Sequence, residues 1–208
     1  MKWIAVSNTK GGVGKSTVSL SLAHWLTQKG HTVAVVDDDR NRTVTKWQAR
    51  ADTNPPSQRP GFKVHPFEEM AQADGCDYGI LDTAASVSDE TIKHLTEFAY
   101  IVLIPCTPDI DALTATQETA DQVIANDGSY VILLNDCPRS SKGENQDIAD
   151  AIADGGYDLI SQFVRHGIGI KRASLAGKTV EQMKGTQRLP WLDFHAAFQE
   201  FSETYLEA

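Results

Sequence analysis

The sequence predicts an α/β fold in which a mostly parallel, twisted sheet is covered by helices on both faces. Apolar runs of strand length alternate along the chain with segments of helical periodicity, and polar motifs follow the apolar runs. This alternation is typical of parallel strands, which are buried on both faces and joined by crossover helices. Because ligands of such folds bind outside the carboxyl ends of the strands, we expect the functional residues at that edge.

Composition indicates one domain over residues 1–208, since 41% of the 208 residues are hydrophobic and can form one core. No apolar run approaches the roughly 18 residues that cross a membrane, and the first residues lack the apolar core of a signal peptide. A cytoplasmic location is therefore expected. The odd number and the spacing of the cysteines favour buried or free thiols over a disulfide framework or a zinc site. These cysteines are Cys76, Cys106 and Cys137.

The first strand is expected near residues 2–8 and the first helix near residues 16–29. Between them lies a glycine-rich segment, Lys-Gly-Gly-Val-Gly-Lys-Ser-Thr, at residues 10–17. Glycines let backbone N–H groups approach an anion, Lys15 supplies a charge for β- and γ-phosphates, and Ser16 supplies a hydroxyl for Mg²⁺. The segment therefore predicts a P-loop, although Thr9 replaces the usual first glycine and Lys10 adds a second cation.

The later elements continue the alternation. Strands are expected near residues 31–37, 78–83, 100–105 and 129–136, and helices near residues 89–97, 111–126 and 145–154. The proline-rich residues 54–61 are expected to form a loop. Near the C-terminus, aromatic residues at helical spacing predict a last helix that packs on the core. These residues are Phe194, Phe198, Phe201 and Tyr205.

The glycine-rich segment resembles the deviant Walker A box of the ParA/MinD ATPases, which have a P-loop NTPase-like fold. The resemblance implies ATP and Mg²⁺ as cofactors and an ATP-dependent homodimer. Lys15 would then bind phosphates in its own subunit, and Lys10 would reach the nucleotide of the other subunit. The nucleotide would contact the residues of this loop, namely Gly11, Gly12, Val13, Gly14, Lys15, Ser16 and Thr17.

Three strand ends extend the resemblance. Asp37 and Asp39 match the family's Asp-x-Asp motif, although Arg40-Asn41 replaces its proline and glutamine. By resemblance, Asp39 positions the attacking water, and Asp37 supports the Mg²⁺ shell. Asp82 ends a Walker B-like strand, where it would hold Mg²⁺ together with Ser16, and Ala84-Ala85 follows in place of two prolines. Asn135 matches the strand-end asparagine that contacts adenine.

The charge distribution is uneven, although the formal net charge is −9. Residues 40–63 hold six basic residues and one acidic residue, and residues 159–192 have the same balance. This segregation predicts one basic face that contacts DNA phosphates without sequence preference, while two solvated segments on opposite sides are the alternative. The family binds DNA through a basic C-terminal surface, which makes Arg165, Lys171 and Arg172 candidate DNA contacts.

The resemblance is closest to the small plasmid-partition ParA proteins. No extension precedes the first strand, and the C-terminus lacks the basic amphipathic anchor of the MinD branch, so no membrane partner is expected. The implied protein is a weak, Mg²⁺-dependent ATPase that segregates or positions a plasmid. Its ATP-bound dimer would bind nucleoid DNA, and a cargo-bound, ParB-like adaptor would stimulate hydrolysis.

Three alternatives remain at this stage. The same ATPase could position a protein cargo, such as a carboxysome or a chemoreceptor cluster. It could be a nucleotide-gated assembly protein with little hydrolysis, because the loops of residues 40–41 and 84–85 depart from the family pattern. It could also be a metabolic P-loop enzyme, although the six histidines form no catalytic constellation and His166 is expected at the surface.

Overall fold

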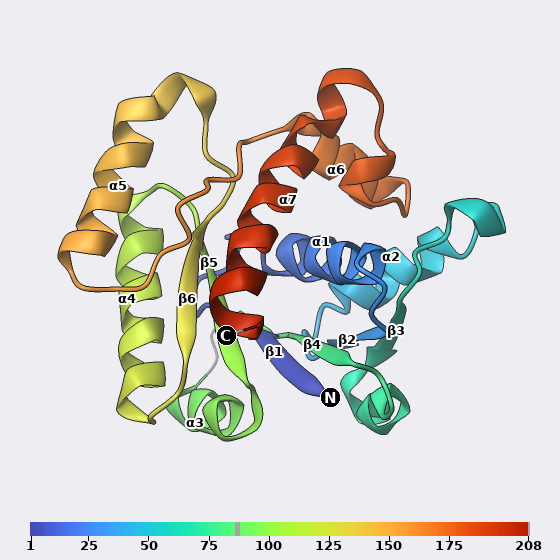
Figure 1. Cartoon of the computed structure of the whole chain (residues 1–208), viewed down its shortest axis with the longest axis horizontal. Helices are drawn as coiled ribbons and strands as arrows, with labels where there is room; N and C mark the ends of the chain where they lie inside the picture. Colours follow the sequence, from blue (N-terminus) through green and yellow to red (C-terminus); the bar gives the residue numbers. More distant parts are fainter. Residues whose placement is uncertain (86–87, 208) are drawn as a thin grey trace.

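Six strands form one all-parallel sheet in the order β3-β2-β4-β1-β5-β6 (Figure 1). The computed structural model describes residues 1–85 and 88–207. The strands are β1 (Lys2–Val6), β2 (Val33–Asp37), β3 (Lys63–Pro66), β4 (Tyr78–Asp82), β5 (Ile101–Cys106) and β6 (Tyr130–Leu134). The predicted fold class, a parallel sheet of the P-loop NTPase type, is therefore confirmed.

Seven α-helices lie within the described residues. They are α1 (Lys15–Gln28), α2 (Thr43–Ala51), α3 (Asp89–Phe98), α4 (Ile110–Ala125), α5 (Lys142–Asp154), α6 (Ile168–Leu175) and α7 (Leu189–Phe201). None of the helices in this part of the chain is long and apolar enough to cross a membrane.

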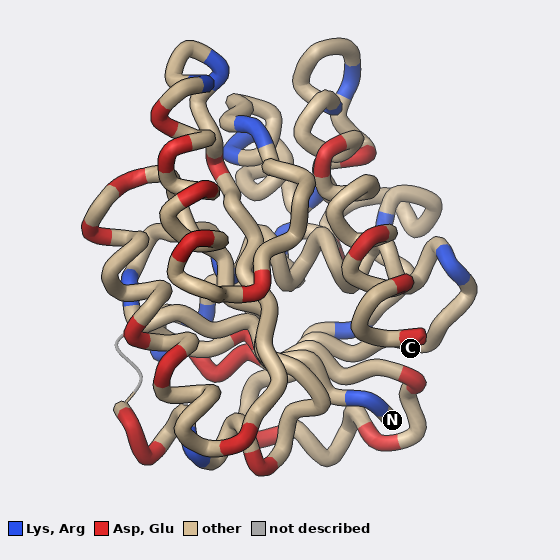
Figure 2. The backbone as a smooth tube through the Cα atoms, turned by 60° about the vertical axis from the view of Figure 1, so that its left-hand side comes forward, with Lys and Arg blue, Asp and Glu red and all other residues tan. Residues whose placement is uncertain are grey.

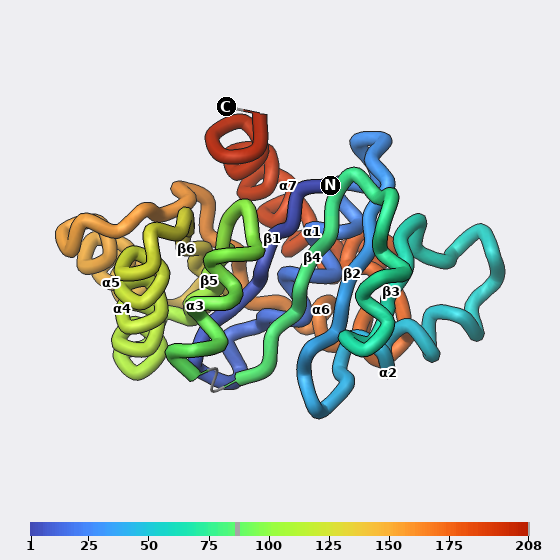
Figure 3. Tube along the Cα trace, turned by 90° about the horizontal axis from the view of Figure 1, so that it is seen from below, coloured from blue at the N-terminus to red at the C-terminus, as the bar shows by residue number. Residues whose placement is uncertain are grey.

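Helices cover both faces of the sheet because the strands are apolar on both sides. In β1, Ile4 packs in the core beneath α1 and α7, whereas Trp3 and Ala5 belong to the opposite core beneath α3 and α4. Viewed from below, α3, α4 and α5 form one group and α1, α2, α6 and α7 form the other (Figure 3). Continuous burial of β2, β4, β5 and β6 accounts for their uninterrupted apolar sequences.

Three elements differ from the sequence expectation, which left β3, α2 and α6 without assignments. Strand β3 is a four-residue edge strand with an exposed Lys63 and a terminal Pro66, so it lacks the continuous apolar pattern of a central strand. Helix α2 carries a readable signal, because Val44, Trp47 and Ala51 are its buried residues at helical spacing. Helix α6 spans only eight residues.

The segment after α5 runs beside β6 and brings a further loop to the carboxyl edge of the sheet. The backbone N–H of Ile160 donates to the carbonyl of Ile132, and that of Val164 donates to the carbonyl of Leu134, each at 2.9 Å. The N–H of His166 then donates to the carbonyl of Cys137 at 2.8 Å. Helix α6 therefore begins close to the end of β6.

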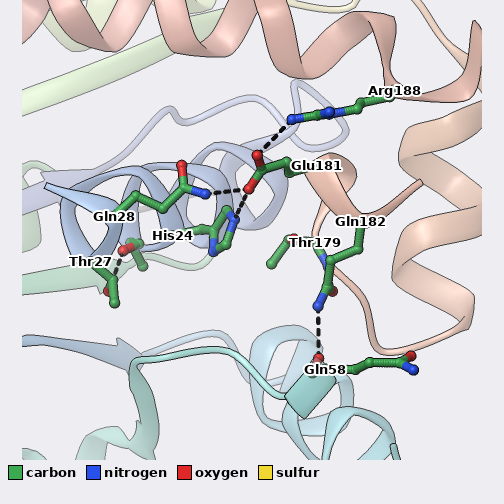
Figure 4. Close-up of polar contacts among 9 residues, drawn as sticks. His24, Thr27, Gln28, Gln58, Thr179, Glu181, Gln182 and Arg188 are labelled. Carbon is green, nitrogen blue, oxygen red and sulfur yellow. Dashed lines mark hydrogen bonds and ion pairs between the residues drawn. The ribbon is translucent and has the colours of Figure 1, made fainter. Parts of the chain in front are cut away.

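Polar contacts tie the segment between α6 and α7 to α1 (Figure 4). Glu181 accepts a hydrogen bond from Gln28, lies 2.8 Å from His24 Nε2, and pairs with Arg188 at 2.7 Å. The side-chain amide of Gln182 donates to the carbonyl of Gln58 at 2.8 Å. The contacts of Glu181 with His24 and Gln28 hold the segment after α6 against α1, and the contact of Gln182 holds it against η1 (Pro56–Gln58).

Candidate nucleotide site

The glycine-rich loop connects β1 to α1 at the carboxyl edge of the sheet. Gly12 and Gly14 have φ angles of 85° and 93°, in the left-handed region that favours glycine. A Cβ on Gly14 would lie 2.2 Å from Nδ2 of Asn135, so no larger residue fits there without a shift. The loop therefore needs glycine at position 14 for both its backbone conformation and its contact with the end of β6.

Lys15 lies within the curve of this loop. Its ammonium donates to the carbonyls of Asn8 and Lys10, each at 2.9 Å. Burial lowers the pKa of Lys15, while the nearby carboxylates of Asp82 and Asp39 act in the opposite direction. The ammonium therefore lies in a partly desolvated position, where its interaction with an anion is stronger than in water.

Asp82 lies at the end of β4 and joins two hydroxyls of α1. Its carboxylate accepts from Ser16 Oγ at 2.7 Å and from Ser19 Oγ at 2.8 Å. Burial raises the pKa of Asp82 to about 7, although both hydrogen bonds oppose the shift. Ser19 was not among the predicted site residues, yet its spacing of one helical turn from Ser16 is a readable signal.

The oxygen donors of Ser16 and Asp82 fit a hard divalent cation such as Mg²⁺. A P-loop supplies few protein ligands and leaves the remaining positions to phosphate oxygens and water. The described residues contain no cluster of three or more His, Cys, Asp or Glu side chains that could hold a metal. The buried Asp82 would also ionise more readily beside a bound cation.

Asp37 lies opposite Asp82 in the β2–β4 ladder and is fully buried. Its carboxylate accepts from the backbone N–H of Asp39 at 3.2 Å and from Thr45, through the N–H at 2.8 Å and the hydroxyl at 2.7 Å. These bonds anchor the first turn of α2, where N–H groups lack helical partners. Its expected part in the Mg²⁺ shell remains a prediction.

Asp39 lies at a pocket of about 330 Å³ beside the loop. Its Oδ1 accepts from the N–H of Asn41 at 3.0 Å and from the Asn41 side chain at 3.2 Å. Thr83 and Ala85 complete this side of the pocket. Asn41 and Ala85, one from each of the two segments that depart from the family pattern, therefore both border this pocket.

A second pocket, of about 360 Å³, lies against the same loop and shares Gly12, Gly14 and Thr17 with the first. Asn135, only 3% exposed, borders it and donates through Nδ2 to the carbonyl of Val13 at 2.9 Å. The Oδ1 of Asn135 is buried without a hydrogen-bond partner in the described part of the chain.

The predicted basic residues have different surroundings. Lys10 is half-exposed, and its ammonium lies 3.8 Å from Asp111 at the start of α4. Arg165 pairs through two nitrogens with Asp193 of α7, which leaves its guanidinium little freedom to contact DNA. Arg172 is exposed on α6.

The two basic segments meet in the fold, because α2 packs against α6. Arg50 Nε donates to the carbonyl of Ser174 at 3.0 Å across this contact. Figure 2 shows several Lys and Arg positions in the loops at the top of the molecule, whereas Asp and Glu predominate toward the lower left. The arrangement favours one basic region over two segments on opposite sides.

Comparisons with known proteins agree with these features. The model of the CobQ/CobB/MinD/ParA nucleotide binding domain matches residues 4–195. The chain is 25% identical to maintenance of carboxysome distribution protein A from Gloeobacter kilaueensis, over 88% of this chain and 85% of the relative. It is 29% identical to protein ParA from Rhizobium radiobacter, over 61% of this chain and 58% of the relative.

Solved structures share the fold. Apo McdA from Cyanothece superposes with a TM-score of 0.76 at 14% identity, covering 97% of this chain and 99% of McdA. MinD from Pyrococcus horikoshii, solved with Mg-ADP, has a TM-score of 0.66 at 18% identity, covering 100% and 98%. The chain belongs to the CobQ/CobB/MinD/ParA family of nucleotide-binding domains, and its relatives place it with the ParA/MinD-type ATPases.

Proposed function

We propose that this protein is an Mg²⁺-dependent ATPase that segregates or positions a plasmid by binding nucleoid DNA as an ATP-bound dimer. The main supporting observation is the presence of two lysines at one phosphate loop. Lys15 lies inside the loop, whereas the Lys10 side chain lies outside it and is 41% exposed. A site within one subunit would use Lys15, and the exposed Lys10 is available to the nucleotide of another subunit.

The residues divide the binding task by their chemistry. The loop N–H groups and Lys15 would hold the phosphates, while Ser16 and Asp82 would hold Mg²⁺, which neutralises phosphate charge when bound. Asp39 faces the pocket beside the loop and would orient the attacking water. On the other side, Asn135 borders the second pocket and would contact the adenine base.

Dimerisation would follow from electrostatics. Two triphosphates enclosed between facing subunits concentrate negative charge, and a Lys10 ammonium from each subunit would offset it. Lys10 would exchange its exposed contact with Asp111 for this phosphate contact. Exposed ion pairs contribute about 0–1 kcal/mol, so Asp111 would present only a small barrier to the exchange.

DNA binding would use the basic region in which α2 and α6 meet. Arg172 is the best placed of the three expected contacts, because Arg165 is paired with Asp193. The protein would be cytoplasmic and associated with the nucleoid, and a cargo-bound, ParB-like adaptor would stimulate its weak hydrolysis. Release from DNA would then follow the nucleotide state.

Retention of a non-specific DNA duplex tests this proposal. Binding would be measured with ATP, ADP and no nucleotide, at low and moderate salt, with Lys15→Ala as the control. We expect retention with ATP only, weakening steeply with salt because phosphate contacts release counterions. Association with ATP but no DNA binding in any state would instead indicate a nucleotide-gated assembly protein.

Three variants separate the assigned roles. Lys15→Ala is expected to abolish nucleotide binding, Lys10→Ala to keep binding but lose the ATP-dependent dimer, and Asp39→Ala to bind ATP without turnover. Calorimetry, sedimentation and phosphate release would measure the three effects. A Lys10→Ala protein that dimerises and hydrolyses normally would rule out the role of Lys10 across the interface.

A protein cargo is the second candidate. It is favoured by the relative named for carboxysome distribution, which aligns over 88% of this chain. Deleting the gene and measuring plasmid loss would separate the two candidates. Normal plasmid inheritance together with uneven spacing of a protein assembly would indicate the protein cargo.

A further inference from the structure

The pocket beside Asn135 is bordered by a cation, Lys171, that the sequence suggested as a DNA contact. Lys171 of α6 borders this pocket together with Gly12, Gly14 and Thr17 of the phosphate loop. The side chain is exposed, and no carboxylate in the described part of the chain lies within ion-pair distance of it. A cation without a carboxylate partner therefore lies beside an anion-binding loop.

The fold places Lys171 there through long-range contacts. The segment before α6 follows β6, so that His166 and Asp136 meet at the pocket with 2.8 Å between His166 Nδ1 and Asp136 Oδ1. Gly169 then allows a close approach, because a Cβ at that position would lie 1.9 Å from the carbonyl oxygen of Gln187. The start of α6 is thus fixed on both sides.

The two pockets indicate the direction in which a nucleotide lies. Asp39 and Thr83 border the first pocket, which suits the terminal phosphate and its attacking water. Asn135, the proposed adenine contact, borders the second pocket, which therefore suits the nucleoside. Lys171 is on the nucleoside side, so the phosphate nearest to it is the one attached to the ribose.

We propose that Lys171 is a nucleotide-binding residue whose ammonium pairs with the α-phosphate, rather than a DNA contact. This inference rests on the nucleotide site proposed above. Lys15 and Lys171 then hold the phosphate chain from opposite ends, the first inside the loop and the second from α6. Because Lys171 acts on the phosphate nearest the ribose, it contributes to binding of ADP as well as ATP.

The neighbouring Arg172 supplies a matched control. It carries the same charge on the same helix and is exposed, yet it does not border the pocket. Calorimetric titration with Mg-ADP would compare the wild type with Lys171→Met, Lys171→Arg and Arg172→Met. Thermal unfolding of each variant without nucleotide would show whether α6 remains folded.

Lys171→Met is expected to raise the Kd for ADP about tenfold, because charge-assisted hydrogen bonds are among the stronger polar interactions. Lys171→Arg should recover most of the affinity, and Arg172→Met should bind ADP like the wild type. At saturating ATP, Lys171→Met should retain DNA as the wild type does.

Equal ADP affinity of Lys171→Met and the wild type would overturn the inference while leaving the nucleotide site intact. Unchanged ADP affinity combined with lost DNA retention would overturn it in favour of a DNA contact. A wild-type protein that fails to bind Mg-ADP would overturn both this inference and the proposed function.

Discussion

The ionised carboxylate of Asp82 lowers the stability of the folded protein when no ligand is bound. Its carboxylate is completely buried, with two hydroxyls as hydrogen-bond donors. Burial raises its pKa from 3.8 to about 7, so the folded state retains a proton that the unfolded state loses over this range. The stabilisation from the protonated carboxyl is therefore complete below pH 4 and is lost as the pH rises toward 7.

Replacement of this carboxyl with a neutral amide is expected to stabilise the ligand-free protein. In EDTA, Asp82→Asn should melt at a higher temperature than the wild type at pH 8, and the difference should shrink as the pH falls from 7 toward 4. Thermal unfolding at several pH values would measure it, with the exposed Asp111→Asn as the control. A difference that does not change with pH would contradict the burial effect.

Lys15 and Lys10 show that neighbouring cations of one motif have different surroundings. The ammonium of Lys15 is held by two backbone carbonyls, whereas that of Lys10 lies 3.8 Å from the carboxylate of Asp111. The sequence motif identifies both residues but does not reveal this difference. It arises because the loop curves around Lys15, leaving Lys10 on its outer side.

At the scale of elements, the placement of α6 decides the shape of the site. This helix packs against α2 and against η5 (Gly185–Arg188). Two glycines permit the contacts. Gly169 faces the carbonyl of Gln187, and Gly177, with a φ of 59°, lies against the backbone of Ala51. The position of α6 therefore depends on close backbone approach at both of its ends.

Gly169→Ala is expected to move α6 away from η5, since the added Cβ would lie 1.9 Å from the carbonyl oxygen of Gln187. Overpacking of this kind costs roughly 1–3 kcal/mol of unfolding free energy. Urea unfolding would measure the loss, and weaker Mg-ADP binding should accompany it because α6 carries Lys171.

Gly143 in α5 is the matched control for this change. Open space surrounds the position where its Cβ would lie. Alanine there should leave stability unchanged or raise it by about 0.5–1 kcal/mol, the usual gain in a helix. Equal losses in both variants would show that the close approach of α6 does not contribute to stability.

At the scale of the whole molecule, the three thiols report on the integrity of the core beneath α3 and α4. Cys106 and Cys137 are buried, and burial raises their pKa values to about 11 and about 12. Cys76 is partly exposed near the amino end of β4. Only Cys76 should therefore react rapidly with a thiol reagent at neutral pH.

Labelling of the native protein at pH 8, followed by mass spectrometry, would check this expectation. All three cysteines should react in guanidinium. Bound Mg-ATP should slow the reaction of Cys137 further, because a ligand that binds only the folded state reduces the population of open states. Rapid native labelling of Cys137 would mean that the edge beside β6 opens more readily than its burial indicates.

Much of the fold could be predicted because the central strands are continuous apolar runs and the long helices are periodic. Strands β1, β2, β4, β5 and β6 were all expected from this pattern. Strand β3 and helix α6 were missed because their local signals are weak, and α2 was missed although its buried residues lie at helical spacing. Their positions depend on contacts with distant segments, such as the stacking of Trp47 on Phe62 at a centroid distance of 5.8 Å.

The sequence by itself predicted the phosphate loop, because the glycines, both lysines and Ser16 lie within eight consecutive residues. It also indicated that Asp39, Asp82 and Asn135 would share one edge, since parallel strands end together. Only the tertiary structure paired Arg165 with Asp193 and brought Lys171 to the loop. Those contacts join residues far apart in the chain, and long-range packing rather than local spacing decides which of them meet.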